Sequence, residues 1–274
     1  MASNRAPAPA TRLRAAPLVA LLLSLAAAAG CVRRAPPPDL SADPAALLAE
    51  VERAQARVER VRGEARVKVA SPDGGGTVTQ YVAAARPDRL RLDALDFFGN
   101  PAAALVTDAG RFALLDLRKG VYYRGAATPE NLARLLPFAI PAEELVALLC
   151  GAAPIAPGRP TAVEPGDGVL RLTVEAEDRV QRLDVGAGAA VHASTLSARP
   201  GLPPPPERYD VTFDRFRERA GRSFPGHVRL EAPASGVTVD LTWKEIEVNA
   251  VVPEGTFTLD PPPGARIVDL DGAR

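Results

Sequence analysis

Residues 89–101 read Arg-Leu-Arg-Leu-Asp-Ala-Leu-Asp-Phe-Phe-Gly-Asn-Pro, and they combine a strand pattern with a loop pattern. Its first half alternates polar and apolar side chains, with Leu90 and Leu92 on one face, which is typical of a half-buried strand. The Gly-Asn-Pro at its end cannot continue a strand, so a loop begins at Gly99. Neighbours in an extended chain point to opposite faces, so Phe97 and Phe98 cannot both enter one core. The sequence therefore predicts an exposed aromatic loop tip, which is typical of a surface that meets an apolar partner.

Short alternating segments recur on both sides of this stretch. The alternation skips a step between Trp243 and Ile246, which indicates a β-bulge. Residues 152–168 are rich in Pro, Gly and Ala, and we expect a link there without a domain boundary. Hairpins in sequence order predict an antiparallel meander of roughly ten strands. The other predicted strands lie near residues 64–69, 78–85, 103–107, 111–117, 121–124, 170–174, 180–185, 209–213, 228–230 and 237–243.

Three segments are predicted to be helices. Asp43-Pro44 supplies an N-cap and a first-turn proline, and the narrow apolar stripe that follows ends near Gly63. Thr128-Pro129 opens a second helix and Pro141 a third. These last two are short and apolar, and we expect them to cover the open side of a curved sheet.

The N-terminus has the order of a bacterial lipoprotein signal. Residues 1–30 carry arginines and no acid, then an apolar run too short to span a bilayer, then small residues directly before Cys31. We expect lipidation at Cys31, a flexible tether over 31–42 and a folded domain over 43–270; an ordinary cleaved signal with an incidental cysteine is the alternative. Val32 is not the Asp that retains lipoproteins in the inner membrane of enteric bacteria, so we expect a protein anchored in the outer membrane and facing the periplasm.

Composition and motifs exclude several function classes. The chain has 33 basic and 33 acidic residues. The charged residues within 1–30 are all arginines, so their removal leaves more acidic than basic residues, and no basic excess attracts nucleic acid. Cys150 has no partner if Cys31 is lipidated, and we expect it to be a buried small hydrophobe. His192 and His227 lack a Cys or carboxylate at ligand spacing, so no metal site is predicted. No catalytic or phosphate-binding motif is present, so we expect neither an enzyme nor a cofactor.

Several short motifs resemble one family. They are Arg89-Leu90-Arg91-Leu92, Phe98-Gly99, Ile140-Pro141, Leu148-Leu149-Cys150-Gly151 and the closing Phe257-Thr258-Leu259-Asp260-Pro261-Pro262-Pro263-Gly264. In this order the chain resembles the LolA/LolB family of outer-membrane lipoprotein-sorting proteins. The resemblance implies a mainly β (α+β) fold: an unclosed antiparallel β-barrel with a helical lid around a hydrophobic cavity for acyl chains. It also implies a LolA-like periplasmic carrier as partner, and an exposed apolar residue before the loop glycine that delivers lipoprotein into the membrane, here Phe98.

Two hypotheses follow for the function. The first is a monomeric, membrane-anchored protein that accepts the acyl chains of lipids or lipoproteins and passes them to the outer membrane through a membrane-insertion loop, Phe97, Phe98 and Gly99. The alternative is an envelope-assembly lipoprotein without lipid cargo, with a solid core and a loop that docks a protein. Tyr122 and Tyr123 either line a cavity or point to opposite faces of their strand. Cavity candidates, each with the alternative of an ordinary core residue, are Leu90, Leu92, Leu114, Leu132, Leu145, Leu148, Phe213 and Trp243.

Overall fold

A computed structural model of the chain describes residues 34–201 and 209–271. The predicted signal peptide, Cys31 and the proline run at 203–206 lie outside the described residues. Residues Ala35–Arg274 form a compact unit of their own. Within the predicted tether, Leu40 packs against the core, and Asp39 accepts a hydrogen bond from the backbone N–H of Gly188 at 3.4 Å.

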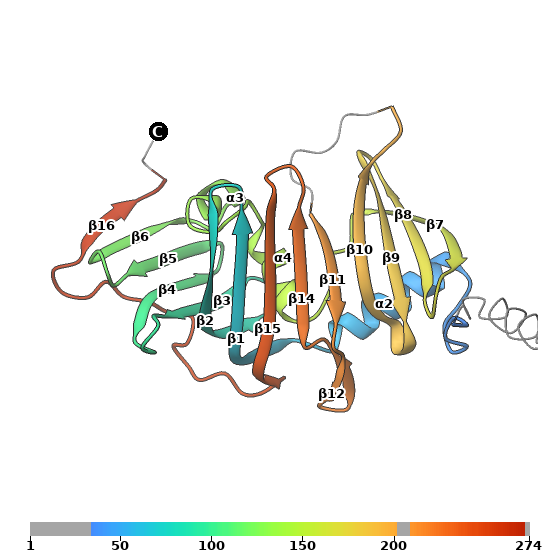
Figure 1. Ribbon diagram of the computed structural model, residues 1–274, viewed down its shortest axis with the longest axis horizontal. Helices are drawn as coiled ribbons and strands as arrows, with labels where there is room; N and C mark the ends of the chain where they lie inside the picture. The colour runs from blue at the N-terminus through green and yellow to red at the C-terminus, as the bar shows by residue number, and fades with distance from the viewer. Residues whose placement is uncertain (1–33, 202–208, 272–274) are drawn as a thin grey trace, which may run out of the picture. The chain divides into compact units, whose positions relative to one another are not determined.

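One large sheet dominates this unit (Figure 1). It has 14 strands in the order β16-β6-β5-β4-β3-β2-β1-β15-β14-β11-β10-β9-β8-β7, and a separate hairpin pairs β12 with β13. Every pair in the large sheet is antiparallel except β16 with β6. The strands are β1 (Arg60–Ser71), β2 (Gly74–Ala85), β3 (Arg89–Leu95), β4 (Pro101–Asp108), β5 (Arg111–Asp116), β6 (Val121–Ala126), β7 (Gly158–Pro165), β8 (Leu170–Ala176), β9 (Arg179–Gly186), β10 (Ala190–Ala198), β11 (Asp210–Asp214), β12 (Arg217–Arg219), β13 (Arg222–Phe224), β14 (His227–Ala232), β15 (Val237–Val248) and β16 (Arg266–Asp269).

The predicted mainly β, unclosed sheet is confirmed, because among the described strands β7 and β16 end the strand order without pairing with each other. The predicted number of strands was too small. β7 lies in the stretch predicted to be a link, since its Pro, Gly and Ala content hides the alternation, and β16 is only four residues long. The predicted bulge is confirmed: Glu64 pairs with Glu245 but Ala65 pairs with Trp243, which leaves Lys244 unmatched.

The helices are α2 (Pro44–Ala56), α3 (Pro129–Ala133) and α4 (Ala142–Leu149), with a short 3₁₀ turn, η1 (Ala187–Ala189). The Asp43 carboxylate caps α2 by accepting from the Ala46 N–H at 2.8 Å. The prediction that this helix continues to Gly63 was wrong, because β1 begins at Arg60. At Gly63 the strands β1 and β15 approach so closely that a Cβ would lie 2.1 Å from the Glu245 carbonyl oxygen.

Both faces of the sheet are covered over part of their area. On one face α2 contacts β7, β8 and β10, α4 contacts β2 and β3, and the helices share one apolar core with the strands (Figure 1). On the opposite face, Tyr122 packs with strands β4 and β5 under Leu259 and Ala265 of the C-terminal segment. Its hydroxyl donates to the Leu259 carbonyl at 2.6 Å, while Tyr123 packs against another cluster, so the two tyrosines face opposite sides.

Candidate functional site

An apolar cavity of about 160 Å³ lies between the sheet and the segment 136–149, which we call the lid. The lid consists of the irregular stretch that follows α3 and of α4. The sheet side comes from β1, β2, β3, β14 and β15, which all present the same face. Gln80 is the one polar side chain among the lining residues, which are Val67, Val69, Val78, Gln80, Leu92, Leu136, Pro137, Phe138, Ile140, Leu145, Leu148, Leu149, Val228, Leu230, Val239 and Leu241.

The structure brings together three of the predicted cavity residues, Leu92, Leu145 and Leu148. The other five lie in packed clusters. Leu90, Phe213 and Trp243 are buried in the main core, Leu132 is buried in a second cluster, and Leu114 packs against that second cluster.

Most of the lining was not predicted, although the signal was present in the sequence. Val67 and Val69 alternate in β1, and Val239 and Leu241 do so in β15, so each pair occupies one strand face. Alternation identifies the face but not the stretch of it that the lid leaves unfilled. That depends on the volume of the lid side chains against the sheet, which strand periodicity does not encode.

The size of the cavity limits what it can hold as it stands. A dry apolar cavity of about 150 Å³ binds a molecule the size of benzene. A fatty acyl chain is several times larger, so the cavity accepts only part of such a chain unless the lid moves away from the sheet.

The loop between β3 and β4 exposes both phenylalanines to solvent. Phe97 is 96% exposed and Phe98 is 85% exposed, and their rings pack edge to face with centroids 5.5 Å apart. Among the described residues these are the two most exposed large apolar side chains. The predicted aromatic tip is therefore present. Strand geometry requires only one of the two rings to be exposed, and the structure exposes both.

Asp96 organises this loop. Its carboxylate accepts hydrogen bonds from the backbone N–H groups of Phe98 at 2.9 Å and Asn100 at 2.8 Å. The Asn100 N–H is the largest cause that lowers the pKa of Asp96 below its ordinary value. Gly99 supplies the left-handed backbone that the turn needs, with φ of +84°. The loop is thus an ordered turn that presents its rings outward.

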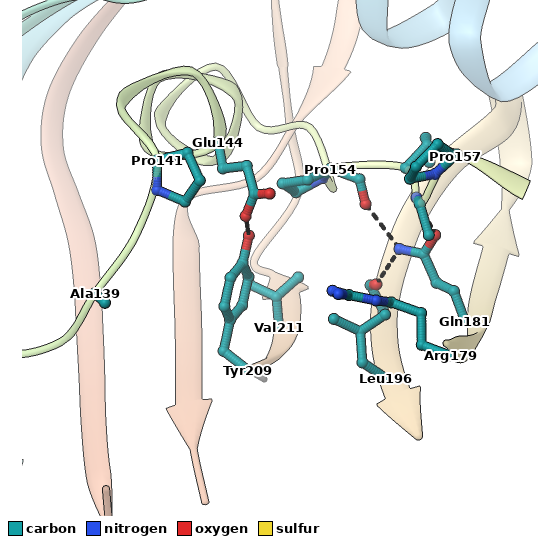
Figure 2. Close-up of a pocket in the computed structure, with 13 residues that line it drawn as sticks. Ala139, Pro141, Glu144, Pro154, Pro157, Arg179, Gln181, Leu196, Tyr209 and Val211 are labelled. Carbon is teal, nitrogen blue, oxygen red and sulfur yellow. Dashed lines mark hydrogen bonds between the residues drawn. The ribbon is translucent and has the colours of Figure 1, made fainter. Parts of the chain in front are cut away.

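A second cavity, of about 270 Å³, has both polar and apolar side chains in its walls (Figure 2). Tyr209 donates its hydroxyl proton to the Glu144 carboxylate of α4, and burial is the main cause that raises the pKa of Tyr209. Gln181 is buried and donates to the Pro154 carbonyl at 2.7 Å and to Ser194 Oγ at 2.9 Å. Figure 2 shows the Arg179 guanidinium extending between these two pairs. Glu144 lies in the first turn of α4, and its bond to Tyr209 ties the lid to the residue before β11.

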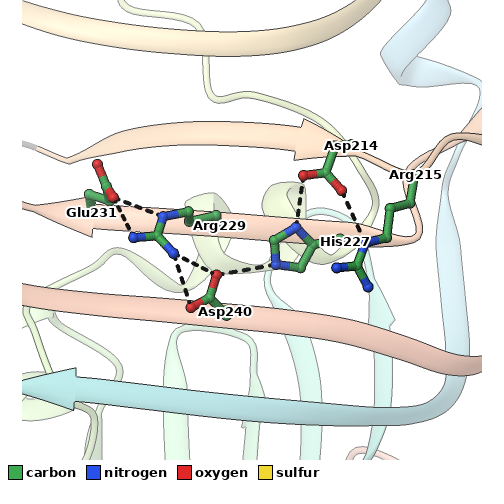
Figure 3. Close-up of polar contacts among 6 residues, drawn as sticks. All are labelled: Asp214, Arg215, His227, Arg229, Glu231 and Asp240. Atoms are coloured by element: carbon green, nitrogen blue, oxygen red, sulfur yellow. Dashed lines mark hydrogen bonds and ion pairs between the residues drawn. The ribbon is translucent and has the colours of Figure 1, made fainter.

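The two histidines lie in different surroundings. His227 Nδ1 lies 3.0 Å from Asp214 of β11, and Nε2 lies 3.2 Å from Asp240 of β15 (Figure 3). Sequence spacing did not reveal these carboxylates, because strand pairing brings them to the ring. They approach opposite nitrogens and do not converge on one point, and no metal-holding group of three or more such residues occurs in the part of the chain that the structure describes. His192 stacks on Phe216, and burial lowers its pKa.

Figure 3 also shows how the cluster around His227 continues along the sheet. Arg229 Nη1 reaches the Asp240 carboxylate at 3.1 Å, and its Nε donates to Glu231 at 2.8 Å. Arg229 and Asp240 form an ion pair between β14 and β15, and the carboxylates of Asp214 and Asp240 contact the His227 ring from β11 and β15. The cluster therefore ties three neighbouring strands together on their polar side.

Comparison with solved structures gives the fold a family context. A domain assigned to outer-membrane lipoprotein sorting from Vibrio parahaemolyticus superposes with a TM-score of 0.53 at 12% identity, over 77% of this chain and 95% of that chain. A LolA superfamily protein from Nitrosomonas europaea gives 0.52 at 13% identity, over 80% and 99%. The fold is LolA-like. A DUF1329 family protein from Desulfovibrio piger gives 0.53 at 12% identity, over 79% and 98%.

The LolA-like fold confirms the family resemblance that the sequence motifs suggested, at the level of the fold. No protein-family model matches the chain, and no curated protein matches it in sequence. Among the described residues, no helix is both long enough and apolar enough to cross a membrane.

Proposed function

We propose that this protein binds the acyl chains of lipids or lipoproteins in the cavity under the lid and passes them to the outer membrane. The observation that carries the proposal is the apolar cavity, lined by 15 apolar side chains and Gln80, in a LolA-like fold. In this proposal Cys31 carries the lipid anchor, and the folded unit faces the periplasm. A LolA-like carrier supplies the acylated cargo.

Apolar burial alone provides the energy for such a role. Each methylene of an acyl chain gains about 0.8 kcal/mol when it leaves water. A bilayer offers the same gain, so a shallow cavity holds its cargo less tightly than the membrane does, and transfer to the membrane runs downhill. The protein needs no reaction chemistry for this step, and we propose that it is not an enzyme.

The exposed Phe97 and Phe98 bring the cavity to the membrane in this proposal. Burial of one Phe side chain gains about 1.5–3 kcal/mol. Two such rings on an ordered turn therefore bind a bilayer weakly and reversibly. This is sufficient to orient a protein that its N-terminal lipid already holds at the surface.

The test uses residues 35–274, which form a compact unit without the anchor. The purified unit is extracted for lipids, which are identified by mass spectrometry, and is then loaded with a fluorescent fatty acid. Release of this probe into liposomes is compared for the parent and for Phe97→Ser/Phe98→Ser. Val251→Ser serves as the control, because Val251 is also an exposed apolar residue, at 78% exposure, but lies in the C-terminal segment.

We expect the double Phe variant to keep its probe and release it slowly, while the control behaves as the parent. A unit that carries no lipid and binds no fatty acid would contradict the proposal and favour the protein-docking alternative. Unchanged release by the double variant would contradict the membrane role of the loop alone.

A further inference from the structure

The turn between β5 and β6, residues 117–120, lies beside the Phe97–Phe98 loop. In an antiparallel meander the β3–β4 and β5–β6 connections leave the sheet at the same end. The backbone N–H of Leu117 donates to the Ala102 carbonyl at 3.1 Å, just after the Phe loop. The positive charge of Arg118 also contributes to lowering the pKa of Asp96 inside that loop.

This second turn combines one apolar side chain with two cations. Leu117 is 45% exposed, and Arg118 and Lys119 after it are exposed. A third exposed cation joins them, because the Arg266 N–H at the start of β16 donates to the Gly120 carbonyl at 3.0 Å. Three exposed apolar side chains and three cations therefore gather at one end of the sheet: Phe97, Phe98, Leu117, Arg118, Lys119 and Arg266.

The acids of the two turns accept hydrogen bonds from the backbone of their own turns. Asp116 accepts from the backbone N–H groups of Arg118 and Lys119, each at 3.1 Å, and Asp96 is likewise used by its own loop. The Asp116 side chain is 19% exposed, whereas its ion-pair partner Lys119 is 71% exposed. An approaching surface therefore meets the cations before it meets the carboxylates.

We propose that the turn 117–120 and Arg266 complete, with the Phe97–Phe98 loop, a docking surface for a bilayer that contains anionic phospholipid. The apolar tips enter the acyl region, and Arg118, Lys119 and Arg266 lie at the level of the lipid phosphates. This arrangement matches a bilayer because apolar insertion and phosphate attraction occur at different depths of the same surface. The inference rests on the proposed function, because it assigns membrane contact to the same loop. It adds that this contact prefers anionic phospholipid.

The charge on the vesicle decides the size of the effect. A Lys or Arg near an anionic surface contributes about 1 kcal/mol, which is about fivefold in partitioning. Removal of two cations should therefore reduce binding to anionic vesicles by about 25-fold. Binding to neutral vesicles should change little, because the Phe side chains remain.

The experiment measures partitioning of the unit 35–274 onto phosphatidylcholine vesicles with and without phosphatidylglycerol, by co-sedimentation at low and high salt. The variant is Arg118→Gln/Lys119→Gln. The matched control is Arg66→Gln/Lys68→Gln, which removes one exposed Arg and one exposed Lys from β1. We expect the first variant to lose the preference for phosphatidylglycerol and its salt dependence, while the control keeps both.

Equal binding of the variant and the control to anionic vesicles would overturn the proposal, as would a parent protein with no preference for anionic lipid. The Phe97→Ser/Phe98→Ser variant separates this result from the proposed function. Loss of neutral-vesicle binding by that variant, together with an inert β5–β6 turn, leaves the proposed function standing and rejects the inference. Fatty-acid binding that is unchanged in Arg118→Gln/Lys119→Gln shows that the cavity and the fold are intact.

Discussion

Replacing Val239 by Trp should block the cavity under the lid. Val239 lies on β15, lines the cavity and is half-buried, so a larger side chain can extend into the empty volume. Tryptophan suits a strand and has the bulk to fill a space of about 160 Å³. Thr238→Trp provides the matched control, because Thr238 precedes Val239 on the same strand and points to the opposite face.

The expected loss follows from the volume of the cavity. A space that takes a benzene-sized molecule accommodates about six carbon atoms of a chain. At about 0.8 kcal/mol per buried methylene, six methylenes contribute about 5 kcal/mol. The dissociation constant of a fatty acid should therefore rise by a factor on the order of a few thousand, since about 1.4 kcal/mol corresponds to a factor of ten.

A fluorescent fatty-acid titration measures both variants, with urea unfolding as the check on stability. We expect Val239→Trp to unfold at nearly the parent concentration of urea, since the side chain fills empty space, and to lose binding. Thr238→Trp should bind as the parent does. A folded Val239→Trp variant with an unchanged dissociation constant would show that acyl chains bind elsewhere, and the assignment of the cavity would then be wrong.

Three further predictions concern Asn249, Asp96 and Cys150. Asn249 has a φ of +58°; its side-chain oxygen accepts from the N–H groups of Glu59 and Arg60, and its amide donates to the Arg57 carbonyl. Asn249→Gly loses these bonds and should lower the unfolding free energy by about 1–2 kcal/mol, and Asn249→Ala should lower it more because alanine disfavours a positive φ. Equal urea midpoints for the three proteins would contradict this. Because its pKa is lowered in the folded loop, the ionised Asp96 favours the ordered turn at neutral pH, and this stabilisation is lost as pH falls below the ordinary value of 3.8 and through the folded pKa. The protection of the Phe98 amide, measured as its exchange rate relative to that of an unstructured peptide at the same pH, should fall over this range, and unchanged protection would argue against it. Burial raises the pKa of the Cys150 thiol to about 11, so alkylation at mildly alkaline pH should be slow in the native protein and fast in urea, and rapid native labelling would show that the thiol is accessible.

Strand periodicity predicted much of this fold because alternation reports one exposed and one buried face. It identified β3 and an exposed aromatic tip after it, although it required only one of the two rings to be exposed, and the skipped step after Trp243 marks the bulge in β15. The proline starts of α2 and α3 are also visible in the sequence, since a cap residue followed by proline is specific to helix N-termini. These features depend on neighbours in the chain, which a sequence displays directly.

The missed features depend on neighbours across the sheet. β7 has Gly158, Pro160 and Pro165 in place of an apolar alternation, and it is held by its pairing with β8. The carboxylates around His227 come from adjacent strands, and the register that aligns them is fixed by the whole sheet. Val61 fits both the helical spacing that includes Val58 and the alternation of the strand that follows, so the sequence alone does not distinguish them. In the structure Val61 pairs with Val248 of β15 and belongs to the strand.

The lid is the part of the structure that must move if an acyl chain is to enter. The strands on the sheet side of the cavity are held by continuous ladders, and β1 alone pairs along its length with both β2 and β15. Between α3 and α4 the lid has no regular structure, and its polar tie to the sheet side near the cavity is the bond from Tyr209 to Glu144. Separation of the strands would break many backbone hydrogen bonds, whereas displacement of the lid mainly exposes Leu145, Leu148 and their neighbours. In the proposed function, an incoming acyl chain would cover that same apolar surface again and so offset the cost of opening, whereas in the empty protein the exposed apolar surface would favour the closed form.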